Sequence, residues 1–310
     1  PPRSTLSSSS AASDVYKRQV LEGIPRRAVK PDVISYNATM SACEKGGQWQ
    51  RALLLLEETG QAHVTTDVIS FSAAMSACEK GGQWQHALSL LQLRFELSLS
   101  EELDENKKMI LFGQDIAGGK GGVFTATRGL TEKFGSDRVF NSPLAESSII
   151  GTAIGMATLG YKPVVEIQFG DYIWTSMMQI RNELATMRYR SNGDWTCPVV
   201  MRVPVGGYIH GSLCHSQSIE GYFTHLPGIR IAYPSNAAVA KGLLKSACRM
   251  DDPILFLEHK GLYRQGYASS NEPSEKYLLE FGKAKIIQQG DDITLVTWGA
   301  LVQKSIEASK

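Results

Sequence analysis

Hydrophobic and polar positions change their pattern near Met109, where short apolar runs begin to alternate with polar loops and helical stretches. Strands that alternate with helices along a chain form mostly parallel sheets with right-handed crossovers. The pattern therefore predicts an α/β domain over residues 101–285, with a mostly parallel sheet and helices on both faces. The apolar runs are Ile110–Phe112, Val139–Phe140, Val164–Phe169, Val199–Val203, Ile229–Tyr233 and Ile254–Leu257.

The part of the chain before this domain contains an internal repeat. The segment DVISYNATMSACEKGGQWQRALLLL starts at Asp32 and returns at Asp67 as DVISFSAAMSACEKGGQWQHALSLL. Each copy predicts two short helices broken at a Gly-Gly pair, and two copies are fewer than a stable solenoid needs. We therefore expect a short α-α repeat segment over residues 20–100, followed by a boundary helix or linker over the charged residues 94–108, which show no core pattern.

Composition excludes several classes of function. The net charge of +1 provides no broad surface for polyanions. The longest uncharged apolar run, Ile149–Gly160, is shorter than the roughly 20 residues that cross a bilayer, so no membrane partner is expected. Five cysteines lie far apart without a CxxC pair, which favours a reducing compartment and argues against zinc or a disulfide framework.

Residues 1–19 are rich in Ser, Arg and Lys and poor in acids, a composition typical of organelle transit peptides. A second interpretation is an artefact, because SAASDVYKRQ resembles translated adapter read-through in transcriptome-derived sequences. We favour the artefact and expect this leader to be unstructured.

The candidate chemistry begins with Glu146, at the head of the apolar run. A helix start favours the carboxylate and an apolar setting favours the neutral acid, so the position suits a group that holds and passes a proton, although a capping role fits equally. Ligands gather at the carboxyl ends of parallel strands. Shortly after predicted strands lie Glu146, Tyr172, His210, His215 and His259.

Two further motifs are weak. In GGKGG, Lys120 is not followed by Ser or Thr, so the segment predicts a flexible loop and no phosphate-binding loop. His210 and His215 have no HExxH pattern, so a metal site is not expected.

The loop GGYIHGSLCHSQS suits an imidazole held for proton transfer. Tyr172 and Trp174 form either core aromatics or a flat face for a heteroaromatic ring.

From about Met109 to Lys310 the chain resembles the β subunit of thiamine-diphosphate-dependent 2-oxoacid dehydrogenase E1 components. The resemblance lies in SPLAESSIIGTAIGMATLGYKPVVEIQFGDYI, RYRSNG, HGSLCHSQS, LPGIRIAYPSNAAVAKGLLKSA and DDITLVTWGALVQ. It implies a transketolase-like pyrimidine-binding domain. It also implies an acyl-transferring, lipoyl-dependent enzyme of the EC 1.2.4 class.

The resemblance implies roles for individual residues. Glu146 matches the glutamate that bonds the aminopyrimidine ring of thiamine diphosphate, Tyr172 matches the aromatic residue packed on that ring, and His215 matches the histidine implicated in proton transfer near lipoyl acylation. A potassium site in relatives uses groups that match Val199, Val200, Cys248 and Asp251, although the segment after Cys248 is one residue shorter here.

Departures from the family limit what this chain can do alone. The diphosphate and Mg²⁺ are bound in the family by a GDG…N motif on the α subunit, and the sequence lacks this motif. We therefore expect half a cofactor site, Mg²⁺ held by the partner, and an inactive isolated chain. Residues 286–310 are expected to begin a truncated C-terminal domain, with a strand over Asp292–Trp298, a helix over Leu301–Ala308 and an exposed apolar edge.

The expected function is oxidative decarboxylation of a branched-chain 2-oxoacid such as 2-oxoisovalerate, with acyl transfer to the lipoyl domain of E2 in an α2β2 assembly. The branched-chain preference rests on RYRSNG and GDYIW, and the alternative is pyruvate. This function implies the mitochondrial matrix, or otherwise the cytoplasm or a plastid. A non-catalytic pseudo-subunit is a further alternative, against which the presence of Glu146 and His215 argues.

The repeat segment resembles the pentatricopeptide repeat, whose arrays bind single-stranded RNA. The resemblance implies base-reading positions at Asn37 with Asp67, and Ser72 in the second copy. The chain would then be an RNA-binding repeat protein fused to an inactive enzyme fragment, with RNA bound only through residues 20–100. We favour a leftover or falsely joined fragment over this function.

Overall fold

The chain divides into two compact units, residues 1–91 with 269–272 and residues 92–268 with 273–310. The computed structural model describes residues 33–61, 73–74, 76–78, 84–207, 211–264, 266–268, 270 and 273–310. The leader, residues 1–19, lies outside the described residues, so the transit-peptide and read-through interpretations both stay predictions. No helix in the described ranges has the length and apolar content that a bilayer crossing requires.

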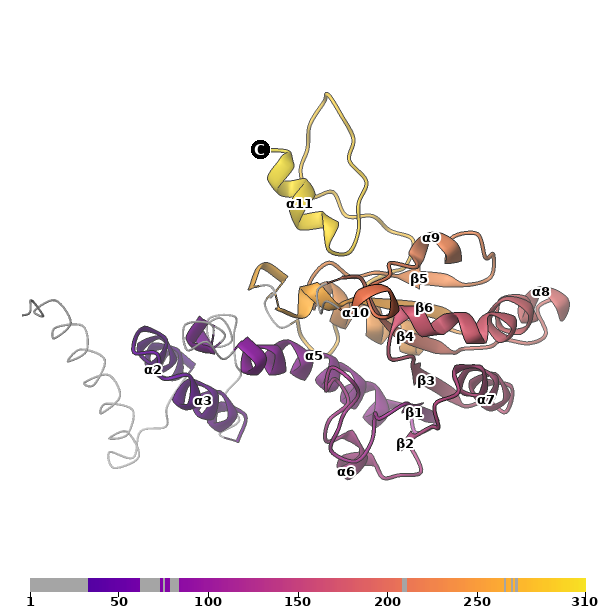
Figure 1. Ribbon diagram of the computed structural model, residues 1–310, viewed down its shortest axis with the longest axis horizontal. Helices are drawn as coiled ribbons and strands as arrows, with labels where there is room; N and C mark the ends of the chain where they lie inside the picture. The colour runs from indigo at the N-terminus through magenta and orange to yellow at the C-terminus, as the bar shows by residue number, and fades with distance from the viewer. Residues whose placement is uncertain are drawn as a thin grey trace, which may run out of the picture. The chain divides into compact units, whose positions relative to one another are not determined.

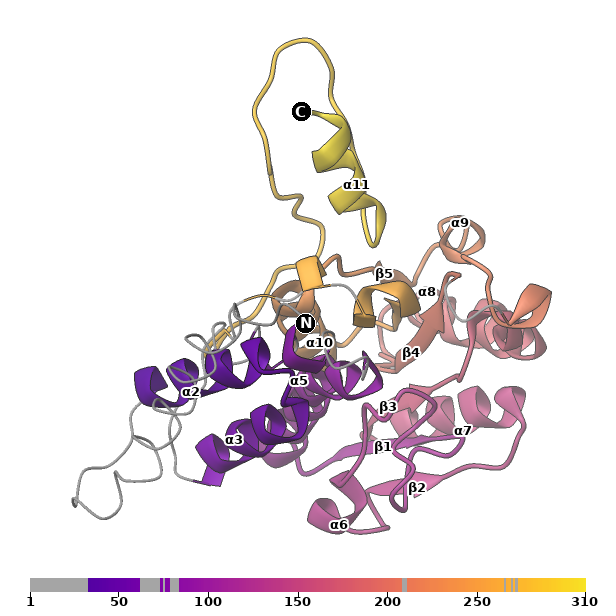
Figure 2. The ribbon, with the colours of Figure 1, turned by 60° about the vertical axis from the view of Figure 1, so that its left-hand side comes forward.

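The first unit contains a helix pair at the first repeat copy. Helices α2 (Val33–Lys45) and α3 (Trp49–Gln61) lie side by side (Figure 2). The turn between them uses Gly47, whose φ of 63° lies in the left-handed region that favours glycine. The helices bury Met40 and Leu55 completely. The observed pair agrees with the predicted break at Gly46 and Gly47.

The second unit is built on a six-stranded parallel sheet (Figure 1). Its strand order is β2-β1-β3-β4-β6-β5. The strands are β1 (Met109–Gly113), β2 (Val139–Asn141), β3 (Lys162–Glu166), β4 (Val200–Val205), β5 (Arg230–Ala232) and β6 (Ile254–His259). All pairs are parallel, so the α/β prediction is confirmed.

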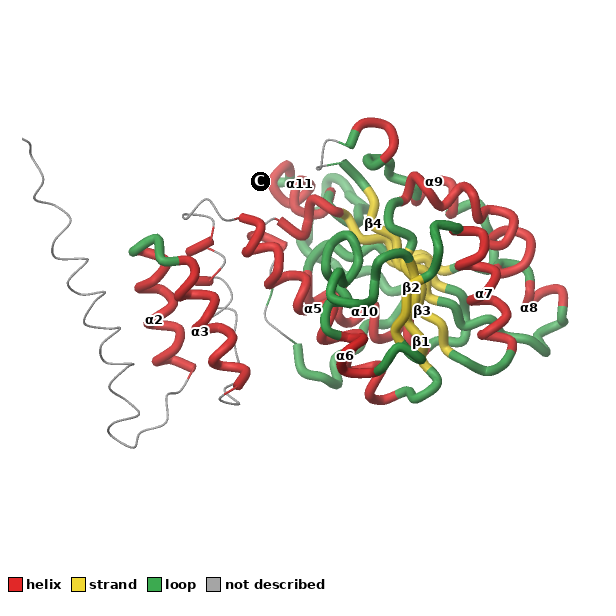
Figure 3. Tube along the Cα trace, turned by 60° about the horizontal axis from the view of Figure 1, so that its bottom comes forward, coloured by secondary structure: helices red, strands yellow, loops and turns green. Residues whose placement is uncertain are grey.

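Helices cover both faces of this sheet, which explains why the central strands β1, β3 and β4 are buried at every position. Helix α7 (Glu146–Thr158) lies on one face, and the opposite face carries α10 (Ala237–Arg249) with the second half of α5 (Trp84–Glu105) (Figure 3). The remaining helical segments are α6 (Leu130–Phe134), η2 (Gly170–Ser176), η3 (Gln179–Leu184), α8 (Met187–Arg190), η4 (Ser212–Cys214), α9 (Glu220–Phe223), η5 (Lys260–Arg264), η6 (Gly266–Ala268) and α11 (Leu301–Ala308).

A charged cluster is buried in the centre of the second unit. Arg202 on β4 is 1% exposed and donates through Nη1 to Glu166 on β3 at 2.8 Å. It also donates through Nε and Nη2 to both carboxylate oxygens of Glu258 on β6, at 2.7 and 2.9 Å. The Tyr263 hydroxyl donates to Glu258 as well. The guanidinium lies over the ring of Phe95 on α5, which connects the cluster to the covering helix.

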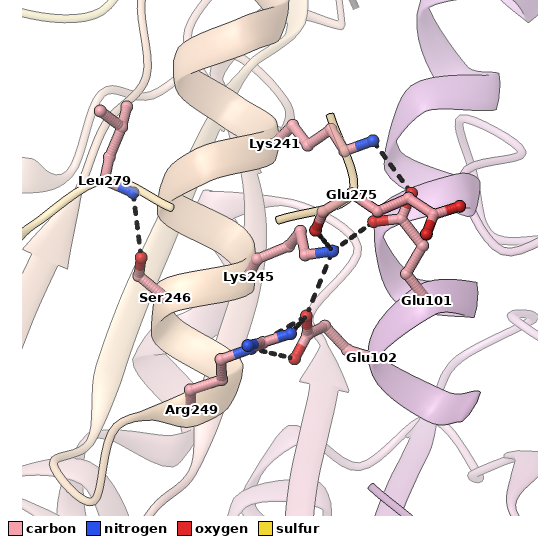
Figure 4. Close-up of polar contacts among 8 residues, drawn as sticks. All are labelled: Glu101, Glu102, Lys241, Lys245, Ser246, Arg249, Glu275 and Leu279. Atoms are coloured by element: carbon pink, nitrogen blue, oxygen red, sulfur yellow. Dashed lines mark hydrogen bonds and ion pairs between the residues drawn. The ribbon is translucent and has the colours of Figure 1, made fainter. Parts of the chain in front are cut away.

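Helix α5 is attached to α10 by a second ionic network (Figure 4). Glu102 accepts from Arg249 Nε at 2.9 Å and Nη2 at 2.8 Å, and Lys245 Nζ lies 3.5 Å away. Glu101 pairs with Lys241 at 2.9 Å and also with Lys245. Because the Glu102, Lys241 and Lys245 side chains are almost fully buried, these pairs are little screened by solvent.

Two expectations outside the sheet are wrong. Residues 94–105 continue α5, which confirms the helix, but Phe95, Leu99 and Leu103 are buried at helical spacing, so the expected lack of a core pattern is wrong. The segment Asp292–Trp298 forms no strand, because no other strand lies beside it in the described chain to pair with its backbone groups. Its apolar side chains are exposed, and the helix over Leu301–Ala308 is confirmed.

Candidate active site

Polar and aromatic side chains meet at the carboxyl edge of the parallel sheet. Gln114 follows β1 directly, Glu146 comes shortly after β2, Tyr172 after β3 and His215 after β4. The parallel pairing of β2, β1, β3 and β4 brings these four segments to one edge. The candidate site is therefore assembled from residues that are far apart in the sequence.

Glu146 is the first residue of α7, where the exposed amides of a helix start stabilise negative charge. Its Oε1 accepts a hydrogen bond from Gln114 Nε2 at 3.1 Å, and its Oε2 accepts one from Thr175 Oγ1 at 3.1 Å. Both donors are neutral, and the half-buried carboxylate has no ion pair with the described residues. The carboxylate is thus oriented by two neutral donors without being neutralised by a cation.

Sequence reasoning missed both donors. Gln114 is 2% exposed, and its Oε1 atom is buried without a partner in the described structure. A polar residue placed directly after a buried strand of a parallel sheet is a signal that would have identified it. Thr175 carries no such signal. Its single hydroxyl proton is within reach of both Glu146 and the Tyr172 carbonyl, and the charged acceptor is the stronger one.

Tyr172 and His215 form a direct hydrogen bond, with 2.7 Å between the tyrosine hydroxyl and Nε2. His215 Nδ1 lies 3.2 Å from the Gly211 carbonyl, which can only accept a hydrogen bond. Nδ1 therefore carries the proton in the neutral ring, and Nε2 accepts from the tyrosine. This arrangement leaves Nε2 as the basic atom that faces Tyr172.

Phe169 fixes the orientation of both rings. Its centroid lies 4.5 Å from that of His215 and 5.6 Å from that of Tyr172, in edge-on contacts. On the other side, Lys260 Nζ lies 5.2 Å from the Phe169 centroid. Lys260 is 1% exposed, its Nζ has no hydrogen-bond partner among the described residues, and burial lowers its pKa to about 8, opposed by the charge of Asp171.

Two other residues that the sequence singled out, His259 and Trp174, pack against aromatic side chains. His259 stacks on Tyr233 with ring centroids 6.4 Å apart. Burial lowers the pKa of His259, and repulsion from the Lys260 charge lowers it further. His210 lies outside the described residues. Trp174 packs on Tyr222 and Phe223, so it acts as a core aromatic.

Lys120 and two glycines of α7 lie at exposed positions. Lys120 of the GGKGG segment forms an exposed ion pair with Asp115 at 2.9 Å. The small residues Gly151 and Gly155 of α7 do not receive a neighbouring backbone from the described chain, because a Cβ atom would meet only Gln179 Cγ at 4.0 Å at the first and nothing at the second.

The four groups expected to bind potassium lie at the opposite edge, near the amino ends of β3 and β4. Val199 and Val200 are fully buried, and the Val199 carbonyl already accepts a hydrogen bond from Ile254 N at 2.9 Å. Cys248 is buried in α10 and Asp251 follows it. No three His, Cys, Asp or Glu side chains gather as a metal site in the described ranges.

The ammonium group of Lys162 lies close to these expected ligands. Lys162 is 6% exposed, and its Nζ donates to the Met250 carbonyl at 2.6 Å. Burial lowers the pKa of Lys162 to about 8, opposed by the charges of Cys248 and then Asp251. A second cation here would be repelled by the ammonium, so the residues present do not fit a potassium ion.

Of the expected RNA-reading positions, only Asn37 is described, and Asp67 and Ser72 lie outside the described residues. Asn37 is 7% exposed, which leaves little of its side chain available to a base. RNA binding by the repeat segment stays a prediction.

Comparison with protein families matches residues 91–265 to the family described as transketolase, pyrimidine binding domain. The chain is 47% identical over 214 residues to the 2-oxoisovalerate dehydrogenase subunit beta of Bacillus subtilis (strain 168), which covers 69% of this chain and 64% of the relative. It is 45% identical over 212 residues to the pyruvate dehydrogenase E1 component subunit beta of the same organism, over 68% and 64% of the two chains.

The chain thus spans 64% of the length of these two curated relatives. Among solved structures, it is similar to one titled split gene transketolase, inactive beta4 tetramer, with a TM-score of 0.54 and 23% identity over 70% of this chain and 64% of that chain. At this identity, the likeness supports the fold alone.

Proposed function

This chain belongs to the family of the transketolase pyrimidine-binding domain, and from that premise we propose that it is a β-type subunit of a 2-oxoacid dehydrogenase E1 component. The similarity to two such β subunits supports the proposal. The observation that carries it is the Glu146 carboxylate, which begins a helix at the carboxyl edge of the sheet and is bonded only to neutral donors in the described chain.

The donor set fits thiamine diphosphate. Glu146 would hold the aminopyrimidine ring through a ring nitrogen, and Tyr172 would lie against the ring. When bound, thiamine diphosphate supplies the carbanion chemistry that the decarboxylation of a 2-oxoacid requires. The carboxylate fits this role because no cation among the described residues competes for it.

The protein's own groups then hold and move protons. Gln114 and Thr175 orient the Glu146 carboxylate, so that it would exchange a proton with a bound ring nitrogen from a fixed position. His215 presents a basic Nε2 atom, which would release the Tyr172 hydroxyl and take up a proton during acyl transfer to a lipoyl group. Phe169 keeps the imidazole edge-on and limits its rotation.

The proposal requires an E1 α partner, since the sequence has no GDG…N motif for the diphosphate and Mg²⁺. The partner would hold those groups, and the lipoyl domain of E2 would accept the acyl group. We propose an α2β2 assembly in which the Glu146 edge faces the α subunit.

For the substrate we propose a branched-chain 2-oxoacid, with pyruvate as the alternative. The 2-oxoisovalerate dehydrogenase relative is 47% identical and the pyruvate dehydrogenase relative 45%. Measuring kcat/KM of the assembled enzyme for 2-oxoisovalerate and pyruvate tests the preference. A higher value for pyruvate would reverse the assignment.

The test of the reaction is Glu146→Gln, assembled with an E1 α partner and thiamine diphosphate. Glutamine keeps the shape but cannot exchange the proton, so decarboxylation should fall by at least about a hundredfold while assembly persists. The matched control is Glu132→Gln on α6, an exposed position away from the site. Full activity of the Glu146 variant would refute the mechanism.

A further inference from the structure

Lys162 occupies the place where the family resemblance implies a potassium ion. It is the first residue of β3, and its side chain reaches Met250, which directly follows α10. Its Nζ donates to the Met250 carbonyl at 2.6 Å. The charged and polarisable groups around it are Cys248, Asp251, Asp252 and Cys197.

The surrounding groups are suited to one monovalent cation. The Met250 carbonyl accepts directly from the ammonium, and the nearby Asp251 and Asp252 carboxylates add negative charge that favours a cation. An ammonium and a potassium ion carry the same charge and favour the same oxygen acceptors. The ammonium has the advantage of a covalent tether, so the protein does not have to immobilise a free ion to satisfy these groups.

The ammonium already uses part of the acceptor set that a second cation would need. The Val199 carbonyl, expected to be a ligand, already accepts a hydrogen bond from Ile254 N at 2.9 Å through one of its two lone pairs. The Met250 carbonyl is bonded to the ammonium. A potassium ion would have to displace the ammonium or sit beside it against charge repulsion.

We propose that the Lys162 ammonium replaces the potassium ion at this position, so that the fold of this chain is stable without potassium. The inference goes beyond the proposed reaction, because it concerns the cation that joins β3 to the end of α10. These elements lie at the edge opposite Glu146, and the test therefore does not depend on catalysis.

The test is thermal unfolding of the full chain in KCl, NaCl and choline chloride at equal ionic strength. Wild type is expected to unfold at the same temperature in all three salts. Lys162→Thr removes the ammonium and opens space for an ion, and should unfold about 10 °C lower in choline chloride. KCl should restore part of this loss, and choline chloride should not.

Lys162→Met is the matched variant, since it removes the charge but fills the space, and KCl should not restore its unfolding temperature. A selective rise of the wild-type unfolding temperature in KCl would overturn the proposal, because a potassium ion would then bind beside the lysine. The proposal would also be overturned if Lys162→Thr were destabilised by the same amount in KCl, NaCl and choline chloride. If neither variant folds, the wild-type salt comparison decides by itself.

Discussion

Replacing Glu166 by glutamine tests how the buried cluster around Arg202 distributes its charge. The cluster holds one guanidinium between two carboxylates, and both carboxylates are nearly inaccessible to solvent. Glu258 receives two bonds from Arg202 and one from Tyr263, whereas Glu166 receives one bond from Arg202. Glu166 is therefore the carboxylate that gains most from taking up a proton.

The magnitude follows from the pKa. Burial raises the pKa of Glu166 to about 7, an effect that the Arg202 charge opposes and Glu258 reinforces. An unfolded glutamate has a pKa of about 4.3, and each pKa unit corresponds to about 1.36 kcal/mol. Because the folded pKa is the higher one, the stabilising effect is complete below about pH 4.3 and is lost as the pH rises to about 7, a loss of roughly 3 kcal/mol.

Urea unfolding of the full chain, followed by tryptophan fluorescence, measures this loss. The free energy of unfolding of wild type minus that of Glu166→Gln should decrease by about 3 kcal/mol between about pH 4.5 and about pH 8. Glutamine does not titrate, so the subtraction removes the contribution of the groups that titrate alike in both proteins. Glu132→Gln, at an exposed position of α6, is the matched control.

A difference between wild type and Glu166→Gln that stays constant over this range would refute the reasoning. A difference that increases with pH would refute it more strongly. It would mean that the ion pair with Arg202 keeps Glu166 charged in the folded protein and that burial is the smaller effect.

Two further predictions concern the site and the helix network. Gly211→Ala places a Cβ atom 2.4 Å from His215 Cβ, so the imidazole ring must move. The NMR signals of His215 should shift, and lipoyl acylation should fall at least about tenfold. The control Gly207→Ala, whose Cβ meets no atom within 4 Å, should change neither. Glu102→Ala removes a buried anion from the α5–α10 network and should lower the free energy of urea unfolding by about 3 kcal/mol. The control Glu105→Ala, at an exposed position, should change it by at most about 0.5 kcal/mol. Equal losses in the two variants would refute the stabilising role of the network.

Several features of the fold were predictable because they depend on local pattern. The apolar runs followed by glycine and polar loops predicted the six strands. The preference for parallel strands with right-handed crossovers predicted that Glu146, Tyr172 and His215 lie at one edge of the sheet. The strand expected over Asp292–Trp298 shows the limit of such reasoning. Alternation of apolar residues specifies a strand only where a neighbouring strand is present to bond it.

The partners of the candidate site residues were not predictable in this way. Gln114 and Glu146 are 32 positions apart, and Tyr172 and His215 are 43 apart, so only the packed sheet brings each pair into contact. The protonated nitrogen of His215 is likewise set by the Gly211 carbonyl, whose direction depends on the conformation of the loop.

By itself, the sequence determined the α/β fold and the edge of the sheet at which a ligand is expected, because both follow from the order of strands and helices along the chain. Only the tertiary structure decided which charges meet inside. Lys162 and Met250 are 88 positions apart, and no local pattern indicates that this ammonium reaches that carbonyl. A buried charge is stable only beside the partner that compensates it, and that partner comes from whichever distant segment the fold brings next to it.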